Sequence, residues 1–202
     1  MKARIVLSVA VAALGLTLAG AADQKFKVGD AGGMKVAQTF SFTSEAQFEN
    51  FTGQTHKVTG AINFDPAKRT GSGKIEVDLG SVDTGIAMRN EHLQSDMWFN
   101  TSKFPKATFE TTAVKHVKGD DDQVTGKLTL HGVTRTITTT ATVRYLPESD
   151  ATRKAMFMGN VVNLKCRFQV KLADYGIMIP DMAKGKVAET IAVNLNVFGY
   201  TG

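Results

Sequence analysis

Residues 164–172, with the sequence LKCRFQVKL, decide the class of fold. Apolar and polar residues alternate through this stretch with a strict period of two, which is typical of a β-strand with one buried and one solvent-facing side. The buried side would carry Leu164, Cys166, Phe168, Val170 and Leu172. Cys166 is therefore expected to be a small interior residue rather than a nucleophile or a redox centre.

The same alternation recurs on both sides of this stretch. The last run, residues 187–197, is apolar at every second position except Glu189, which would point inward if the register holds. Earlier runs lie at 58–64, 75–79, 109–117, 124–130 and 137–145, and Phe40, Phe42 and Phe48 suggest an opening strand region. Between the runs we expect turns at 71–73, 119–122 and 131–132, and a loop over 147–154.

Helix is scarce in this sequence. The best candidate is residues 87–94, with Asp83 or Thr84 supplying a capping oxygen. Many strands with little helix favour either an antiparallel barrel or a two-sheet sandwich. A barrel would explain why few edge-protecting prolines occur among the strands, but the residues alone leave both architectures open.

The first 22 residues have the three parts of a secretory signal peptide. Lys2 and Arg4 give a basic start, residues 5–18 are apolar, and residues 19–22 are small, as signal peptidase requires. The apolar run is shorter than the ~20 residues that span a bilayer, and no second long one follows. We therefore expect a single domain, residues 23–202, of a protein exported to the periplasm or secreted, without a membrane span.

Composition narrows the function further. Removing Lys2 and Arg4 lowers the formal charge from +5 to +3, and the remaining basic residues are interspersed with acids, so nucleic acid is not an expected partner. Cys166 is the only cysteine, which excludes an intramolecular disulfide. A chain of about 180 residues can bury a sufficient core without disulfides or metals.

Residues 88–105, MRNEHLQSDMWFNTSKFP, interrupt the strand-like sequence and are where function is expected. Their mixture of polar, aromatic and methionine side chains suits a molecule with one polar end and a long apolar body. Arg89, Asn90 and His92 are the candidate head-group contacts, because burying an unpaired polar group costs roughly 1–3 kcal/mol. Structural roles suit Arg89 and His92 equally well. The candidate contacts for the apolar body are Met88, Met97, Trp98, Phe99, Phe104, Phe109, Cys166, Phe168 and Met178.

Catalytic and metal-binding patterns are not expected in this chain. The spacings of His56, His92, His116 and His131 match no metal-binding signature, and neither a phosphate loop nor a nucleophile elbow is present. We therefore expect a non-enzymatic protein. The enzymatic alternative is a lipid hydrolase that uses His92 with Asp96.

Several motifs in a fixed order give the chain a family resemblance. They are residues 58–66 (VTGAINFDP), 75–78 (IEVD), 81–85 (SVDTG), 89–93 (RNEHL) and 126–134 (GKLTLHGVT). Together they resemble the YceI-like family over nearly the whole mature chain. The resemblance implies a lipocalin-like antiparallel β-barrel of about eight strands with one short helix, exported to the bacterial periplasm. It also implies an elongated apolar cavity that holds a polyisoprenoid, an isoprenoid quinone or a fatty-acid derivative.

One departure from the family concerns Asn90, where the family commonly has Asp. The negative charge beside Arg89 is therefore missing, and we expect Arg89 to pair with Glu91 or Asp96 instead.

The physical case for a ligand cavity is independent of the family. An eight-stranded barrel can hold one small ligand if its inward residues are small. Small residues fall at the inward positions Gly60, Gly126, Thr139, Ala141 and Cys166. We therefore expect a carrier of a non-covalent isoprenoid or acyl lipid with no other cofactor, and leave open whether it forms a homodimer. The alternative is a filled barrel that acts through its outer surface, as a partner-binding or stress-protective module.

Overall fold

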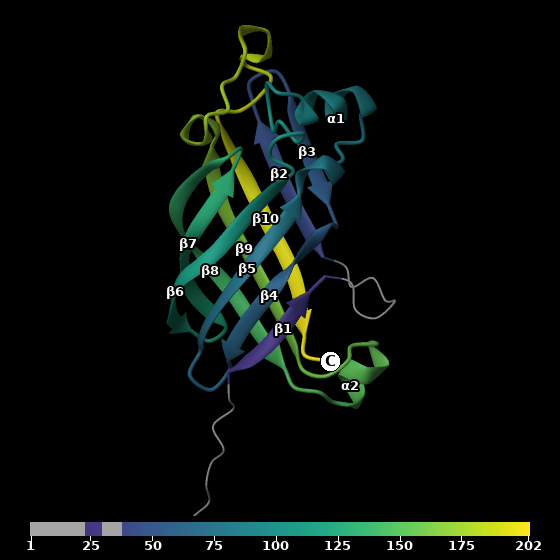
Figure 1. Cartoon of the computed structure of the whole chain (residues 1–202), viewed down its shortest axis with the longest axis vertical. Helices are drawn as coiled ribbons and strands as arrows, with labels where there is room; N and C mark the ends of the chain where they lie inside the picture. Colours follow the sequence, from purple (N-terminus) through teal and green to yellow (C-terminus); the bar gives the residue numbers. More distant parts are fainter. Residues whose placement is uncertain (1–22, 30–37) are drawn as a thin grey trace, which may run out of the picture.

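The computed structural model describes residues 23–29 and 38–202, and this part of the chain forms a closed antiparallel β-barrel (Figure 1). The barrel closes because β1 pairs with both β4 and β10. In spatial order its eight strands are β1 (Gln24–Val28), β4 (Val58–Asp65), β5 (Thr70–Asp78), β6 (Lys106–Lys118), β7 (Asp121–Leu130), β8 (Val133–Leu146), β9 (Val161–Lys171) and β10 (Thr190–Tyr200). The expected barrel is confirmed, and the sandwich is excluded.

A hairpin of two further strands, β2 (Thr39–Glu45) and β3 (Asn50–Thr55), extends one end of the barrel. β10 pairs with β9 along its whole length, but its other edge is divided between β2 and β1. The hairpin is tied to the loop after β5 by Gln54 and Asp83, whose backbone N–H groups each donate to the other's carbonyl oxygen at 2.9 Å. Phe48 lies in the hairpin turn and is exposed, so it is not part of the opening strand as predicted.

The alternation of β9 and β10 produces the buried interior that was predicted. Cys166 and Phe168 pack against the core, and Val170 is fully part of it. The register that would turn Glu189 inward does not extend to this residue, because β10 begins one residue later and Glu189 is exposed. Its carbonyl oxygen accepts a hydrogen bond from the backbone N–H of Leu172, which joins the ends of β9 and β10.

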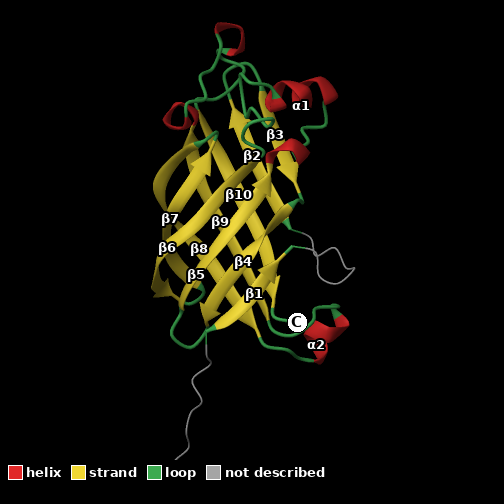
Figure 2. Cartoon of the chain, viewed as in Figure 1, coloured by secondary structure: helices red, strands yellow, loops and turns green. Residues whose placement is uncertain are grey.

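Helical segments lie at the two ends of the barrel (Figure 2). The predicted helix is α1 (Ala87–Gln94), but Asp83 and Thr84 do not cap it; Ile86 is the N-cap residue and makes no side-chain cap bond. The loop predicted over 147–154 contains a second helix, α2 (Asp150–Lys154), which begins at a capping box formed by Ser149 and Thr152. Three 3₁₀ turns complete the set: η1 (Leu79–Ser81), η2 (Leu172–Tyr175) and η3 (Asp181–Ala183).

Two of the predicted turns are displaced. Residues 71–73 belong to β5, and the chain reverses earlier, at 66–69, where the Asp65 carboxylate accepts hydrogen bonds from the backbone N–H groups of Ala67 and Lys68. Likewise Asp121 and Asp122 belong to β7, not to a turn. The turn at 131–132 is confirmed, with φ values of 51° and 75°.

The predicted signal peptide lies outside the described residues. Within the described part of the chain, no helix has the length and apolar character needed to cross a membrane.

Candidate functional site

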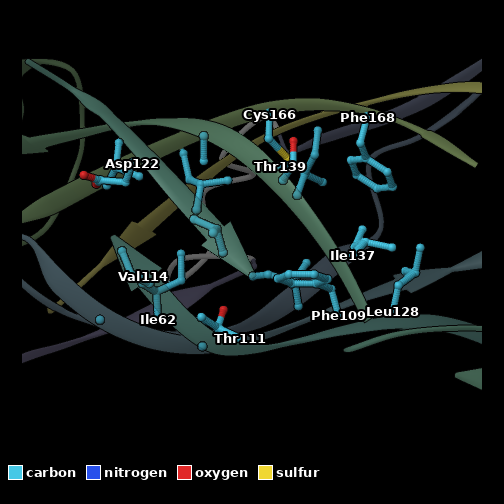
Figure 3. Close-up of a pocket in the computed structure, with 18 of the residues that line it drawn as sticks. Ile62, Phe109, Thr111, Val114, Asp122, Leu128, Ile137, Thr139, Cys166 and Phe168 are labelled. Atoms are coloured by element: carbon cyan, nitrogen blue, oxygen red, sulfur yellow. The ribbon is translucent and has the colours of Figure 1, made fainter. Parts of the chain in front are cut away.

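An axial cavity of about 110 Å³ runs inside the barrel between β4–β5 and β7–β9. Its wall is predominantly apolar, and Figure 3 shows the long arrangement of its side chains, with Asp122 at one end and Phe168 and Leu128 toward the other. Among the described residues, Asp122 is the one charged residue in that wall. The cavity could therefore hold an apolar chain, and its one charged side chain, Asp122, lies at one end.

Small residues create this space, as the sequence predicted. Thr139, Ala141 and Cys166 line the cavity directly. Gly126 contributes indirectly, because a Cβ atom at this position would lie 2.3 Å from Cζ of Phe109, whose ring also lines the cavity. Burial raises the pKa of the Cys166 thiol to about 11, so the thiol is neutral at physiological pH. It behaves as part of the apolar wall.

A buried polar network closes the barrel at the Asp122 end. The Asp122 side chain is fully buried, and its Oδ1 accepts hydrogen bonds from Arg69 Nε at 3.1 Å and from His116 Nδ1 at 2.8 Å. Arg69 Nη2 donates to the other carboxylate oxygen at 2.7 Å. The same nitrogen lies within hydrogen-bonding distance of the carbonyl oxygens of Asp120 and Val143, so Arg69 links the β4–β5 turn to β7 and β8.

A separate end pocket of about 500 Å³ lies at the α1 end of the molecule, between α1, the β2–β3 hairpin and the segment before β10. Five of the predicted contacts line it, namely Arg89, His92, Met97, Trp98 and Phe99. Arg89 forms an ion pair with Glu49 in the β2–β3 turn, and its guanidinium group lies 4.5 Å from the centroid of the Phe51 ring. The predicted pairing of Arg89 with Glu91 or Asp96 is therefore wrong.

The two hollows follow one another along the barrel but share no lining residue. On β2, for example, Phe40 lines the axial cavity and Phe42 the end pocket. Phe42 and Phe99 are both buried and meet edge to face, with ring centroids 6.0 Å apart. The end pocket and the axial cavity are therefore lined by different sets of side chains.

Sequence comparison places the chain in a family. The model of the YceI-like domain matches residues 31–198. The chain belongs to the YceI-like family. It is 33% identical over 203 residues to a UPF0312 protein of Shewanella denitrificans, covering 98% of each chain. It is 34% identical over 178 residues to Protein YceI of Escherichia coli, covering 81% of this chain and 85% of that protein.

Two solved structures share the fold. BcnA of Burkholderia cenocepacia superposes with a TM-score of 0.69 at 24% identity, over 82% of this chain and 98% of BcnA. A protein of Saccharophagus degradans, described as a polyisoprenoid binding domain implicated in plant cell wall breakdown, gives a TM-score of 0.66 at 22% identity, over 88% and 98% of the two chains. At these identities the similarity establishes the barrel architecture.

The predicted contacts of this YceI-like protein fall into three groups. Phe109, Cys166 and Phe168 line the axial cavity, whereas the five contacts named above line the end pocket. Four residues line neither hollow, namely Met88, Asn90, Phe104 and Met178.

Asn90 and Phe104 have structural contacts in the described part of the chain. The Asn90 amide donates to Asp83 Oδ1 at 2.7 Å, and its oxygen accepts from the backbone and hydroxyl of Thr84. The hydrogen bond from the Asn90 amide to Asp83 is the largest cause of the lowered pKa of the Asp83 carboxyl group. Phe104 packs edge-on against His131, with ring centroids 5.0 Å apart.

Asp122 and its partners were missed by the sequence interpretation. The run of three aspartates after Gly119 was taken for a turn, although Asp122 has the same parity as the inward-facing Val124 and Leu128. Extending the alternation of β7 backwards by one step would have placed a carboxylate inside the barrel. Within the described residues, no group of three or more His, Cys, Asp or Glu side chains could hold a metal ion.

Proposed function

We propose that this YceI-like protein is a non-enzymatic carrier that holds one long, linear apolar molecule in the axial cavity. The observation that carries the proposal is the apolar wall inside a closed barrel, together with the small residues that keep the space open. The expected guests are an isoprenoid, an isoprenoid quinone or an acyl lipid. The description of the Saccharophagus degradans protein as a polyisoprenoid binding domain supports the same class of guest.

The dimensions of the cavity favour a chain over a wide ring system. Its volume of about 110 Å³ is below the 300–1,000 Å³ of typical ligand pockets, so a long guest needs rotation of wall side chains such as Phe109 and Phe168. A flexible single chain requires the smallest rearrangement. Each buried methylene group contributes about 0.8 kcal/mol, so ten would contribute about 8 kcal/mol before the cost of immobilising the chain.

Two parts of the proposal concern location and catalysis. We place the mature protein in the periplasm because residues 1–22 have the pattern of a signal peptide. We assign no catalytic activity, and the hydrolase alternative gains no support from His92 and Asp96, because these side chains form no hydrogen bond with each other in the described structure.

The test is native mass spectrometry of the protein purified from its own periplasm, followed by organic extraction and identification of the released compound. A matched pair of variants locates the guest. Cys166→Leu adds volume to the cavity wall, whereas Lys165→Leu places the same leucine side chain on the exposed face of the same strand. We expect a stoichiometric long-chain compound in the wild-type protein and in Lys165→Leu, and reduced occupancy in Cys166→Leu.

A bare polypeptide mass that stays bare after incubation with polyprenols, quinones and fatty amides would refute the carrier proposal. The protein would then be a filled barrel, and its outer surface would be the place to search for a partner.

A further inference from the structure

Three neighbouring strands carry basic residues without any acidic ones. β8, β9 and β10 lie side by side in the barrel (Figure 1), and their sequences contain no aspartate or glutamate. On the outer face of β9, Lys165 and Arg167 are both exposed and lie about 7 Å from each other along the strand, because they are two residues apart. Basic and acidic residues are interspersed along the whole chain, but strand pairing separates them on this face.

The outer face of these strands is hollowed by a groove of about 450 Å³. Lys165 lies in this groove and is paired with Thr142 on β8 and with Asn196 on β10, so these three residues form a row across the strands. One step further along the strands, the groove is lined by Thr140, Arg167 and Asn194. We call the groove lined by these six polar residues the outer groove.

The two cations of the outer groove lack a partner in the described part of the chain. Neither the Lys165 ammonium group nor the Arg167 guanidinium group makes an ion pair or a side-chain hydrogen bond there. The row of Lys165 ends at a carboxylate on β7, Asp121, which lies two strands away and accepts a hydrogen bond from the Thr142 hydroxyl at 2.9 Å. A ligand with its own negative charges would supply partners for both cations.

The Asn196 amide is oriented by a buried neighbour. Nδ2 of Asn163 lies 3.1 Å from the carbonyl oxygen of Val197 and 2.8 Å from Oδ1 of Asn196. Because the Val197 carbonyl can only accept, the Asn163 group is the donor in both bonds, and the Asn196 atom that faces it is the amide oxygen. The NH₂ group of Asn196 is therefore left as a hydrogen-bond donor for a ligand.

The lining of the outer groove favours an acidic sugar chain over other anions. Surfaces that bind single-stranded nucleic acid stack the bases on aromatic side chains, and surfaces that bind membranes insert large apolar ones. The apolar residues that border the groove, Cys166 and Leu195, also line the axial cavity and belong to the barrel wall. Hydroxyl and amide groups beside two cations instead match a ligand that carries both hydroxyl groups and carboxylates.

We propose that the outer groove binds a linear acidic polysaccharide built from uronic acids. Lys165 and Arg167 bind its carboxylates, and Thr140, Asn194 and Asn196 form hydrogen bonds with its hydroxyl groups. The groove lies on the outside of the wall whose inner side lines the axial cavity. The proposed sugar site is therefore separate from the carrier site and independent of the guest.

The experiment uses two probes with the same sugar backbone, hexamannuronate and the neutral mannohexaose. Their dissociation constants for the mature protein are measured by isothermal titration calorimetry at pH 7 and low ionic strength. We expect hexamannuronate to bind about 5- to 30-fold more tightly than mannohexaose, the effect of two exposed ion pairs. This preference should decrease as added salt screens the charges.

A matched pair of double variants locates the binding site. Lys165→Gln/Arg167→Gln should lose most of the preference for the acidic probe. The control, Lys25→Gln/Lys27→Gln, removes two exposed cations with the same spacing on the outer face of β1, and it should keep the preference. Thr140→Val removes one exposed hydroxyl group without a change of charge, and it should weaken hexamannuronate binding about 2- to 5-fold.

A second measurement uses the wild-type protein alone. In the ¹H–¹⁵N spectrum, the side-chain NH₂ signals of Asn194 and Asn196 report on the outer groove directly. We expect both signals to shift when hexamannuronate is added.

Several outcomes would overturn the proposal. If the control double variant loses as much of the preference as the groove variant, the attraction is a general effect of positive charge. If Thr140→Val binds like the wild type and the two asparagine signals do not shift, the groove does not contact the sugar. If hexaglutamate, or vesicles of phosphatidylglycerol, bind through Lys165 and Arg167 more tightly than hexamannuronate, the ligand is not a polysaccharide. The carrier function stands in each case, because it is tested by the compound extracted from the axial cavity.

Discussion

Replacing Arg69 by methionine should strongly destabilise the barrel. Arg69 Nε and Nη2 lie 3.1 and 2.7 Å from the two carboxylate oxygens of Asp122, which is fully buried. The variant would leave that carboxylate in the interior with His116 as its one side-chain partner. Removing one partner of a buried ion pair typically costs about 3–5 kcal/mol, because the other charge is left uncompensated.

Urea unfolding measures this loss. With a slope of about 2 kcal/mol per molar urea, the midpoint should fall by about 1.5–2.5 M, and the melting temperature by roughly 8–16 °C. The control is Arg144→Met, which breaks the exposed pair between Arg144 Nε and Asp120 Oδ2, 3.1 Å apart, and should cost less than about 1 kcal/mol. The double variant Arg69→Met/Asp122→Leu removes the unpaired charge and should recover much of the stability.

The reasoning is refuted if Arg69→Met unfolds within about 1 kcal/mol of the wild type, or if the double variant is less stable than Arg69→Met by a further 3 kcal/mol or so. Either result would mean that the carboxylate does not depend on the guanidinium group for its burial.

Three further predictions concern other parts of the barrel. Burial raises the pKa of the Cys166 thiol from 9.0 to about 11, so at pH 8 it should react with a disulfide reagent about 100-fold more slowly than an unperturbed thiol. The reaction rate should rise as the pH approaches 11, and fast labelling of the folded protein at pH 8 would contradict this expectation. Gly126→Ala should cost about 1–3 kcal/mol in urea unfolding, because its Cβ would lie 2.3 Å from the Phe109 ring, and an unchanged midpoint would mean that the ring moves freely. Asn90→Asp should lower the melting temperature at pH 7, because it replaces the donor to Asp83 with a second carboxylate. Because the pKa of Asp83 is lowered in the folded state, its hydrogen bond stabilises the fold above the ordinary pKa of 3.8, and this contribution is lost as the pH falls below that value. The deficit of the variant should therefore shrink as the pH falls below 3.8, and a deficit that stays constant would point to another cause.

The regular strands could be predicted from the sequence because their faces alternate locally. The stretch 164–172 alternates with a period of two, and residues 164–171 of it lie in β9. The helix over 87–94 is confirmed as α1, although its sequence has no clear apolar face. Strand ends could not be predicted in the same way. Glycines at 71 and 73 resemble a turn, yet pairing with β4 extends them, and that partner is chosen by the closure of the barrel.

The candidate site was only partly accessible from the sequence for a related reason. Aromatic and methionine residues near α1 do gather, as predicted, but in a pocket that shares no lining residue with the axial cavity. Which of two neighbouring hollows a side chain lines depends on packing between distant segments, such as Phe42 against Phe99. The partners of Asp122 illustrate the same limit, because Arg69 is 53 residues away and no local pattern connects the two.

The cost of the open cavity is itself an argument for a guest. A void in an apolar core destabilises a protein by about 24 cal/mol per Å³, so a cavity of about 110 Å³ costs roughly 2–3 kcal/mol. Substituting larger residues at Thr139, Ala141 or Cys166 would recover that energy, and β-strands accept such residues readily. The polar network at Asp122 can hold the barrel together while the cavity stays open, because its bonds join the β4–β5 turn to β7 and β8 across one end. Space that is costly, lined by small residues and held open by a separate set of bonds is expected where a ligand, not a side chain, completes the core.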